Sequence, residues 1–394
     1  MGRFNPKSFA QPDLLKGIEP FNLIRILEPC RAFLETRGLS LPREDGSEID
    51  YLKLSGILAQ PDEWMDSHVI EGLHVIGNLG TDENFDDLLD IARRNFIDVN
   101  LEATAADLAA RIWLEMPQAL EVKDREAGSR CRRKFESFRA RDPENVLPVE
   151  QLPTQFDALE ADLEGWFLAR KRGVGCRVIR VDLPGEVRFL VQHGDPFKRQ
   201  PSRKGAQSTC TYFRPERTDL VVYDFVNNEL RISTRTLGEL RLYREKFGKH
   251  LFGDPEKFVY AQKYTLLPLK KLGAAALYCR DVGGMERVCL KEIEYAWPDT
   301  IAHTEKHKSE DVFKTLARLK RRIELDADIL HAVFSVKLVG EKTARPVSIK
   351  PPNIAEYGRG EDAAIIEEWF RAREFVRVGS VDGDEEADTF MAVA

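Results

Sequence analysis

Asp219 has the residue type and the position that a metal-dependent nuclease would use for catalysis. It stands at the start of a predicted strand, in the sequence RTDLVVYDF that begins at residue 217. Carboxylate oxygens are preferred ligands of Mg²⁺, and a nearby lysine would orient or activate the attacking water. Such a site needs Glu-x-Lys near the end of the next strand. That strand ends in Ser233-Thr234-Arg235, two neutral hydroxyls and a guanidinium that stays protonated and cannot act as a base.

The elements predicted around Asp219 would place this carboxylate in a small sheet between two helices. Residues 156–247 predict the order helix, two strands, polar loop, two strands, helix. Tight turns are expected at Asp182-Leu-Pro-Gly and at Asn227-Asn228, each joining a pair of strands. The polar loop is expected at residues 193–205.

This element order, together with Asp219, resembles the core of the PD-(D/E)xK nuclease superfamily over about a quarter of the chain. The resemblance implies a site in which an aspartate and a Glu-x-Lys surround Mg²⁺. Because the Glu-x-Lys is absent here, it implies a degenerate nuclease-like core; an unrelated α/β domain is the alternative. An active enzyme would need Asp219 together with help from Glu164, Asp182 or Glu229.

Two basic segments are candidates for contact with nucleic acid. The segment 124–141 carries seven basic and three acidic side chains, and the predicted loop 193–205 is also rich in cations. If these segments converge, they would follow a phosphate backbone with salt-sensitive affinity; as separate clusters they would be ordinary solvated surface. The expected contact residues are Arg132, Arg133, Lys198, Arg199, Arg203 and Lys204.

The remaining motifs give little chemistry. His303 and His307 flank Glu305 at a spacing that zinc could use on a helix, but Thr304 stands where a metalloprotease has its glutamate. We therefore expect a charged linker there and no metal site. A phosphate-binding Gly-x-x-x-x-Gly-Lys loop and a Gly-x-Ser-x-Gly nucleophile motif are both absent from the sequence.

Hydrophobic periodicity predicts a multidomain α+β protein. Residues 1–145 are expected to form a helical bundle, residues 155–305 a central mixed α/β domain, and residues 309–380 a small α+β or winged-helix-like module. Within the central domain, strands are expected at 264–269, 276–279 and 286–294. Residues 381–394 form an acidic tail.

Composition narrows the classes of protein to consider. The 394 residues are 43% hydrophobic with a net charge of −7, so the chain can build cores and is not a global polycation. Its six cysteines are dispersed, which is typical of reduced thiols. The sequence shows no signal-peptide pattern and no apolar run of membrane-spanning length. A cytoplasmic, prokaryotic protein is expected.

Three functions fit these observations. The preferred one is a non-catalytic, macromolecule-binding subunit of a DNA-processing or phage-defence assembly, which contacts DNA or RNA through its basic segments, has a protein partner and needs no cofactor. The second is a Mg²⁺-dependent nuclease centred on Asp219. The third is a scaffold or sensor that contacts only protein.

Overall fold

The computed structural model describes residues 5–42, 48–100, 102–130, 134–260, 262–297, 303–358 and 362–377. The chain divides into two compact units. The helical unit comprises residues 1–128 with 203–209, and the sheet unit comprises residues 129–202 with 210–394. The protein is mixed α+β with one large antiparallel sheet. Within the described residues, none of the helices combines the length and the apolar character needed to cross a bilayer.

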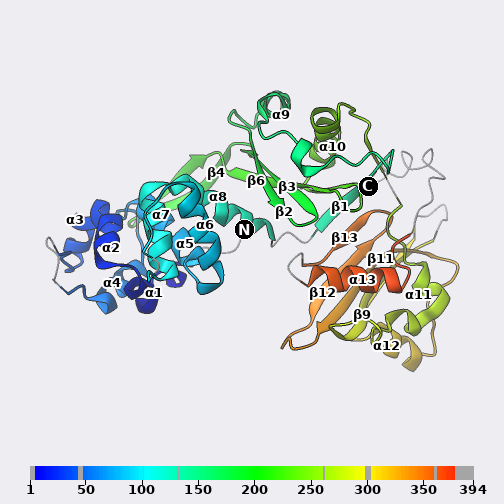
Figure 1. Cartoon of the computed structure of the whole chain (residues 1–394). Helices are drawn as coiled ribbons and strands as arrows, with labels where there is room; N and C mark the ends of the chain where they lie inside the picture. Colours follow the sequence, from blue (N-terminus) through cyan, green and yellow to red (C-terminus); the bar gives the residue numbers. More distant parts are fainter. Residues whose placement is uncertain are drawn as a thin grey trace. The chain divides into compact units, whose positions relative to one another are not determined.

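The helical unit is built from short helices (Figure 1). Their buried apolar side chains share one core. Side-chain caps begin two of these helices. The Asp66 carboxylate accepts hydrogen bonds from the first-turn amides of His68 and Val69, and the Thr104 hydroxyl accepts one from the Asp107 amide. The helices are α1 (Pro12–Gly17), α2 (Pro20–Leu27), α3 (Arg31–Thr36), α4 (Tyr51–Leu58), α5 (Ser67–Leu79), α6 (Phe85–Arg94), α7 (Ala105–Glu115) and α8 (Pro117–Arg130).

The sheet unit contains an 11-stranded sheet whose order along the main path is β10-β9-β11-β12-β13-β1-β7-β6-β3-β2, with β8 pairing on β1. The strands of this sheet are β1 (Lys134–Ala140), β2 (Arg177–Leu183), β3 (Glu186–Gly194), β6 (Glu216–Asp224), β7 (Glu229–Ser233), β8 (Phe258–Tyr260), β9 (Met285–Ala296), β10 (Thr304–Lys308), β11 (Asp328–Leu338), β12 (Arg345–Lys350) and β13 (Ile354–Glu356). A separate two-stranded ribbon is formed by β4 (Lys198–Lys204) and β5 (Gln207–Phe213).

Helices cover the sheet at two places and create two cores. Helices α9 (Asp157–Ala169) and α10 (Leu237–Phe252) lie together over the strands around β3 and β6 (Figure 1). Their core includes Phe167, Phe189 and Phe247, all fully buried. Helices α11 (Leu267–Leu272), α12 (Val312–Arg318) and α13 (Ala363–Ala372) enclose the second core against β9 and β11. The first of these cores positions the candidate site.

Three predicted segments have a different structure in the protein. The segment 193–205, predicted as a polar loop, continues β3 and then forms β4, because a polar strand can pair with another polar strand where neither face must be buried. The predicted strands 264–269 and 276–279 are replaced by α11 and a 3₁₀ helix (Gly273–Leu277). Pro268 in the first turn of α11 favours helix initiation. The predicted charged linker around His303 and His307 contains the strand β10.

Candidate functional site

Asp219 lies on β6 with its side chain on the face that α9 and α10 cover. Side chains alternate along a strand, so Asp219 shares this face with Val221 and Tyr223, both of which belong to the helix-covered core. Asp219 is 0% exposed. Burial of a carboxylate is costly unless it is paired and hydrogen-bonded, so its partners decide what it can do.

Four side chains surround the Asp219 carboxylate. Arg217 Nη2 donates to Oδ1 at 2.7 Å. Oδ2 accepts from the Tyr243 hydroxyl at 2.8 Å, and His193 Nε2 lies 3.1 Å from the same oxygen. The Thr234 hydroxyl lies 3.0 Å from Asp219 Oδ2 and 2.6 Å from Glu239 Oε2, and its single proton is donated to one of them at a time. Burial and the neighbouring carboxylate raise the pKa of Tyr243 well above its usual value, so the phenol stays a donor.

Glu239 forms the second half of this cluster. It is the third residue of α10 and completes a capping box with Thr236: the Thr236 amide donates to Oε2 at 3.0 Å, and the Glu239 amide donates to the Thr236 hydroxyl at 3.2 Å. Arg217 donates to both carboxylate oxygens, at 3.0 and 3.1 Å, and Arg172 donates to Oε1. Burial raises the pKa of Glu239, but the hydrogen bonds from Thr234 and Arg172 and the charge of Arg217 outweigh it and lower the pKa to about 2.

The cluster does not fit a divalent cation. His193, Asp219 and Glu239 each present a ligand atom, and these atoms lie within 4.8 Å of one another. The Arg217 guanidinium, however, bridges the two carboxylates, and Arg172 pairs with Glu239 as well. Two negative charges therefore meet two permanent positive charges. A metal ion would have to displace a bidentate arginine and break hydrogen bonds to all four carboxylate oxygens.

Sequence reasoning selected Asp219 but missed the residues that surround it. Two patterns could have revealed them. Arg217 stands two residues before Asp219, on the same face of the strand, where a cation can reach the carboxylate. Thr236-Leu-Gly-Glu239 is a capping box, which predicts that the glutamate folds back onto the start of its helix. The position of His193 opposite Arg217 arises only from the register of β3 and β6.

The other predicted acidic residues are engaged in local structure. Glu164 accepts hydrogen bonds from the amides of Gly175 and Cys176, at 2.6 and 3.0 Å. Asp182 pairs with Arg180 at 2.6 Å. Glu229 pairs with Lys263. None of these three acids belongs to the His193 cluster, which is the only group of potential metal ligands within the described part of the chain.

The predicted basic residues Lys198, Arg199, Arg203 and Lys204 all lie on β4 of the ribbon (Figure 1). Both ribbon strands are exposed along nearly their whole length. The tip, residues 203–209, clusters with the helical unit, where the Gly205 amide donates to Glu63 and the Lys204 ammonium lies 5.9 Å from the Trp64 ring centroid. Arg132 and Arg133 lie outside the described residues.

The root of the ribbon is fixed to the sheet unit by Arg214. Its guanidinium donates to the carbonyl oxygens of Lys171 and Asp195, at 2.6 and 3.0 Å. This arrangement needs a glycine at position 194, because a Cβ there would lie 2.2 Å from the Arg172 oxygen and 2.6 Å from Arg214 Cδ. The ribbon therefore leaves the sheet next to the buried cluster.

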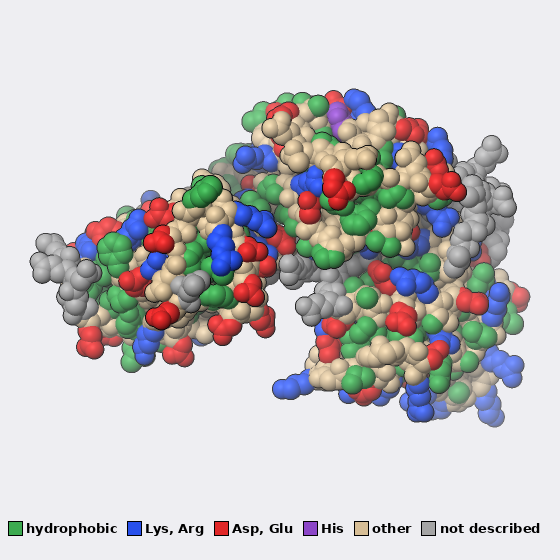
Figure 2. All heavy atoms as spheres, viewed as in Figure 1, with side chains coloured by type: hydrophobic (Ala, Val, Ile, Leu, Met, Phe, Trp, Pro, Cys, Tyr) green, Lys and Arg blue, Asp and Glu red, His purple; other side chains and the backbone are tan. Residues whose placement is uncertain are grey.

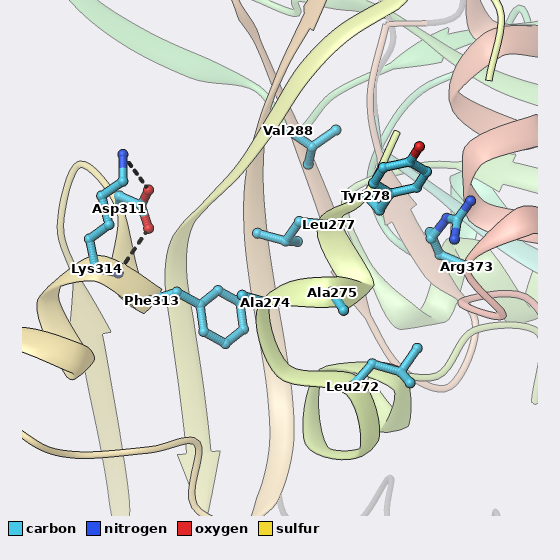
Figure 3. Close-up of a pocket in the computed structure, with 10 residues that line it drawn as sticks. All are labelled: Leu272, Ala274, Ala275, Leu277, Tyr278, Val288, Asp311, Phe313, Lys314 and Arg373. Carbon is cyan, nitrogen blue, oxygen red and sulfur yellow. Dashed lines mark hydrogen bonds and ion pairs between the residues drawn. The ribbon is translucent and has the colours of Figure 1, made fainter. Parts of the chain in front are cut away.

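A shallow cavity of about 630 Å³ lies at the other end of the sheet unit, beside α11 and α12 (Figure 3). Its lining is mostly apolar, with Leu272 and Tyr278 about half exposed. The charged side chains that line it are already paired: Asp311 lies 3.3 Å from Lys314, and Arg373 pairs with Asp281. The cavity therefore presents no free charged group aimed at a ligand.

No protein-family model matches the chain, and no curated protein matches it. The geometry of the ribbon and of the buried cluster is thus the basis for the functional conclusion.

Proposed function

We propose that the protein binds nucleic acid through the β4–β5 ribbon and has no catalytic role in cutting it. One observation carries this proposal. Residues 196–215 contain five basic side chains and no acidic one, in a chain whose net charge is −7. In contrast, acidic and basic side chains are intermixed on the face of the molecule drawn in Figure 2.

Electrostatics explains why this segment is suited to a polyanion. Cations that contact phosphates release condensed counterions, and this release supplies most of the affinity of non-specific binding. Lys198 retains half of its side-chain exposure. Its acidic partner, Asp195, also lies within 4 Å of the exposed Arg235. Because Asp219 and Glu239 already compensate the charge of Arg217, it is Lys198 and Arg235 together that leave the surface around Asp195 positive. Burial raises the pKa of Asp195, but these cations lower it overall and keep it ionised.

The buried cluster supports a binding role over a nuclease role. An active PD-(D/E)xK-like site would need Asp219 free to coordinate Mg²⁺, whereas its oxygens already accept from Arg217 and Tyr243. We propose that the cluster is structural: its hydrogen bonds and ion pairs hold β3, β6, β7 and α10 together. A nuclease-like ancestry of this core, and membership of a DNA-processing or phage-defence assembly, stay predictions from the sequence.

The test is a binding titration across salt concentrations. Fluorescently labelled single-stranded DNA, duplex DNA and RNA are titrated with the wild type and with the double variant Lys198→Gln/Arg199→Gln. A matched control, Lys308→Gln/Lys314→Gln, removes two exposed lysines from the other end of the sheet unit. We expect the ribbon variant to reduce the slope of log K against log salt by roughly 1 for each lost phosphate contact, and the control to leave it unchanged.

Two results would contradict the proposal. One is the absence of binding to all three probes at 50 mM salt. The other is an unchanged salt slope in the ribbon variant, which would place the contact elsewhere. Preserved thermal unfolding midpoints would show that both variants are folded, as expected for exposed positions.

A further inference from the structure

The ribbon root carries exposed aromatic side chains next to arginines. Phe197 and Tyr212 are 61% and 60% exposed. Arg199 Nε donates to the Tyr212 hydroxyl at 3.3 Å, and the Arg214 guanidinium lies 6.0 Å from the Phe197 ring centroid. These two contacts link the strands on one side of the ribbon, which we call the aromatic–arginine face. All four of these residues belong to the sheet unit.

The opposite side of the ribbon carries hydroxyl groups in place of the exposed rings and arginines. Ser202 and Thr211 share a hydrogen bond of 3.0 Å between their hydroxyls, and alternation places Lys198 and Phe213 on their side. Phe213 is 38% exposed, less than either aromatic of the aromatic–arginine face. The two most exposed rings of the ribbon root therefore lie on one side.

Exposed aromatic rings that alternate with cations match the requirements of unpaired nucleotides. Each base has a flat π-face that stacks on an aromatic side chain, and the phosphates between bases pair with arginine or lysine. In a duplex the base faces are already stacked on one another, so the rings would gain nothing there. Phe197 and Arg199 are two residues apart, a separation of about 7 Å along an extended chain.

We infer that the aromatic–arginine face binds single-stranded nucleic acid, with bases stacked on Phe197 and Tyr212 and the phosphates contacting Arg199. This inference rests on the proposed function and names its ligand class. Double-stranded nucleic acid would contact only the basic side chains of the ribbon.

The experiment compares two probes and four variants of the full chain. The probes are a fluorescein-labelled oligothymidine of about 16 nucleotides and a duplex of the same length. The variants Phe197→Leu and Tyr212→Leu remove a ring while keeping an apolar side chain, and Tyr212→Phe keeps the ring but loses the hydroxyl. Phe96→Leu is the matched control, because Phe96 is 96% exposed on the helical unit.

We expect the single strand to bind more tightly than the duplex. Each ring-removing variant should weaken single-strand binding by about 5- to 150-fold, the range for loss of one stacked base. Its salt slope should stay the same, since no charge is lost. Tyr212→Phe and Phe96→Leu should stay within about twofold of the wild type.

The failures are distinguishable. Equal or tighter binding of the duplex, or unchanged single-strand affinity in both ring-removing variants, would overturn the single-strand inference and leave the proposed function standing. If neither the single strand nor the duplex binds at low salt, both the single-strand inference and the proposed function are overturned.

Discussion

Replacing Glu239 by glutamine tests whether the buried cluster is a charge-balanced structural element. The substitution keeps the shape of the side chain but removes one of the two negative charges that Arg172 and Arg217 compensate. Glu239 is 0% exposed, so water cannot solvate the guanidinium groups that lose their negative partner. A fall of the glutamate pKa from 4.5 to about 2 on folding corresponds to roughly 3 kcal/mol of stability at neutral pH.

The sign of the pH dependence follows from the direction of the pKa shift. The pKa of Glu239 is lower in the folded state than in the unfolded state, so its contribution is fully present above pH 4.5 and is lost as the pH falls toward 2. At pH 3 only about 1.5 kcal/mol of the contribution should be left. The glutamine variant has no such group. The difference in unfolding free energy between the wild type and Glu239→Gln should therefore shrink by roughly half between pH 7 and pH 3.

This difference can be measured by urea titration, with hydrogen exchange of peptides from β6 and β7 as the signal. These peptides report the stability of the sheet unit, so unfolding of the helical unit does not affect the measured free energy. Glu245→Gln on the same helix is the control. Its carboxylate is half exposed and pairs with Lys246, and it should change stability by less than about 1 kcal/mol. A difference below 1 kcal/mol at pH 7 for Glu239→Gln, or one that stays constant down to pH 3, would refute the charge-balance reasoning.

Two further substitutions check the packing around the cluster. Gly194→Ala should destabilise the sheet unit by about 1–3 kcal/mol, because the new Cβ would lie 2.2 Å from the Arg172 oxygen; thermal unfolding measures this. Gly165→Ala in α9, where a Cβ meets nothing within 4 Å, should instead stabilise by about 0.5–1 kcal/mol, and a loss equal to that of Gly194→Ala would contradict the steric explanation. Tyr243→Phe should cost roughly 1.5–3 kcal/mol in urea unfolding, since it removes a 2.8 Å hydrogen bond to the buried charge of Asp219; an unchanged midpoint would show that this bond adds nothing.

The sequence alone was sufficient for elements with strong local signals. The segment 362–371 carries apolar residues at helical spacing, and it forms α13 with Ile366, Trp369 and Phe370 buried, because apolar residues at that spacing must face a core. The hairpin turn at Asn227-Asn228 is confirmed. Asn228 has a φ of 49°, a conformation that asparagine tolerates better than most residues.

Elements with weak local signals were predicted wrongly. The β4 sequence KRQPSRK has neither apolar alternation nor strong strand formers, so its pattern predicts a loop. Pairing with β5 stabilises it. The segment 264–269, expected to be a strand, is a short apolar run, and such runs do not distinguish strand from helix. Its packing into the core that contains Trp369 is compatible with the helix α11.

The sequence by itself determined the residue types at the candidate site: an aspartate on a strand without Glu-x-Lys on the next one, and a run of five cations without an acid. Only the tertiary structure decided what those residues do. The register of β3, β6 and β7 brings His193 and Thr234 to Asp219, and the start of α10 adds Glu239. Coulombic pairing and hydrogen bonding depend on separations of a few ångströms, and such separations between residues distant in sequence are set by strand pairing and helix packing.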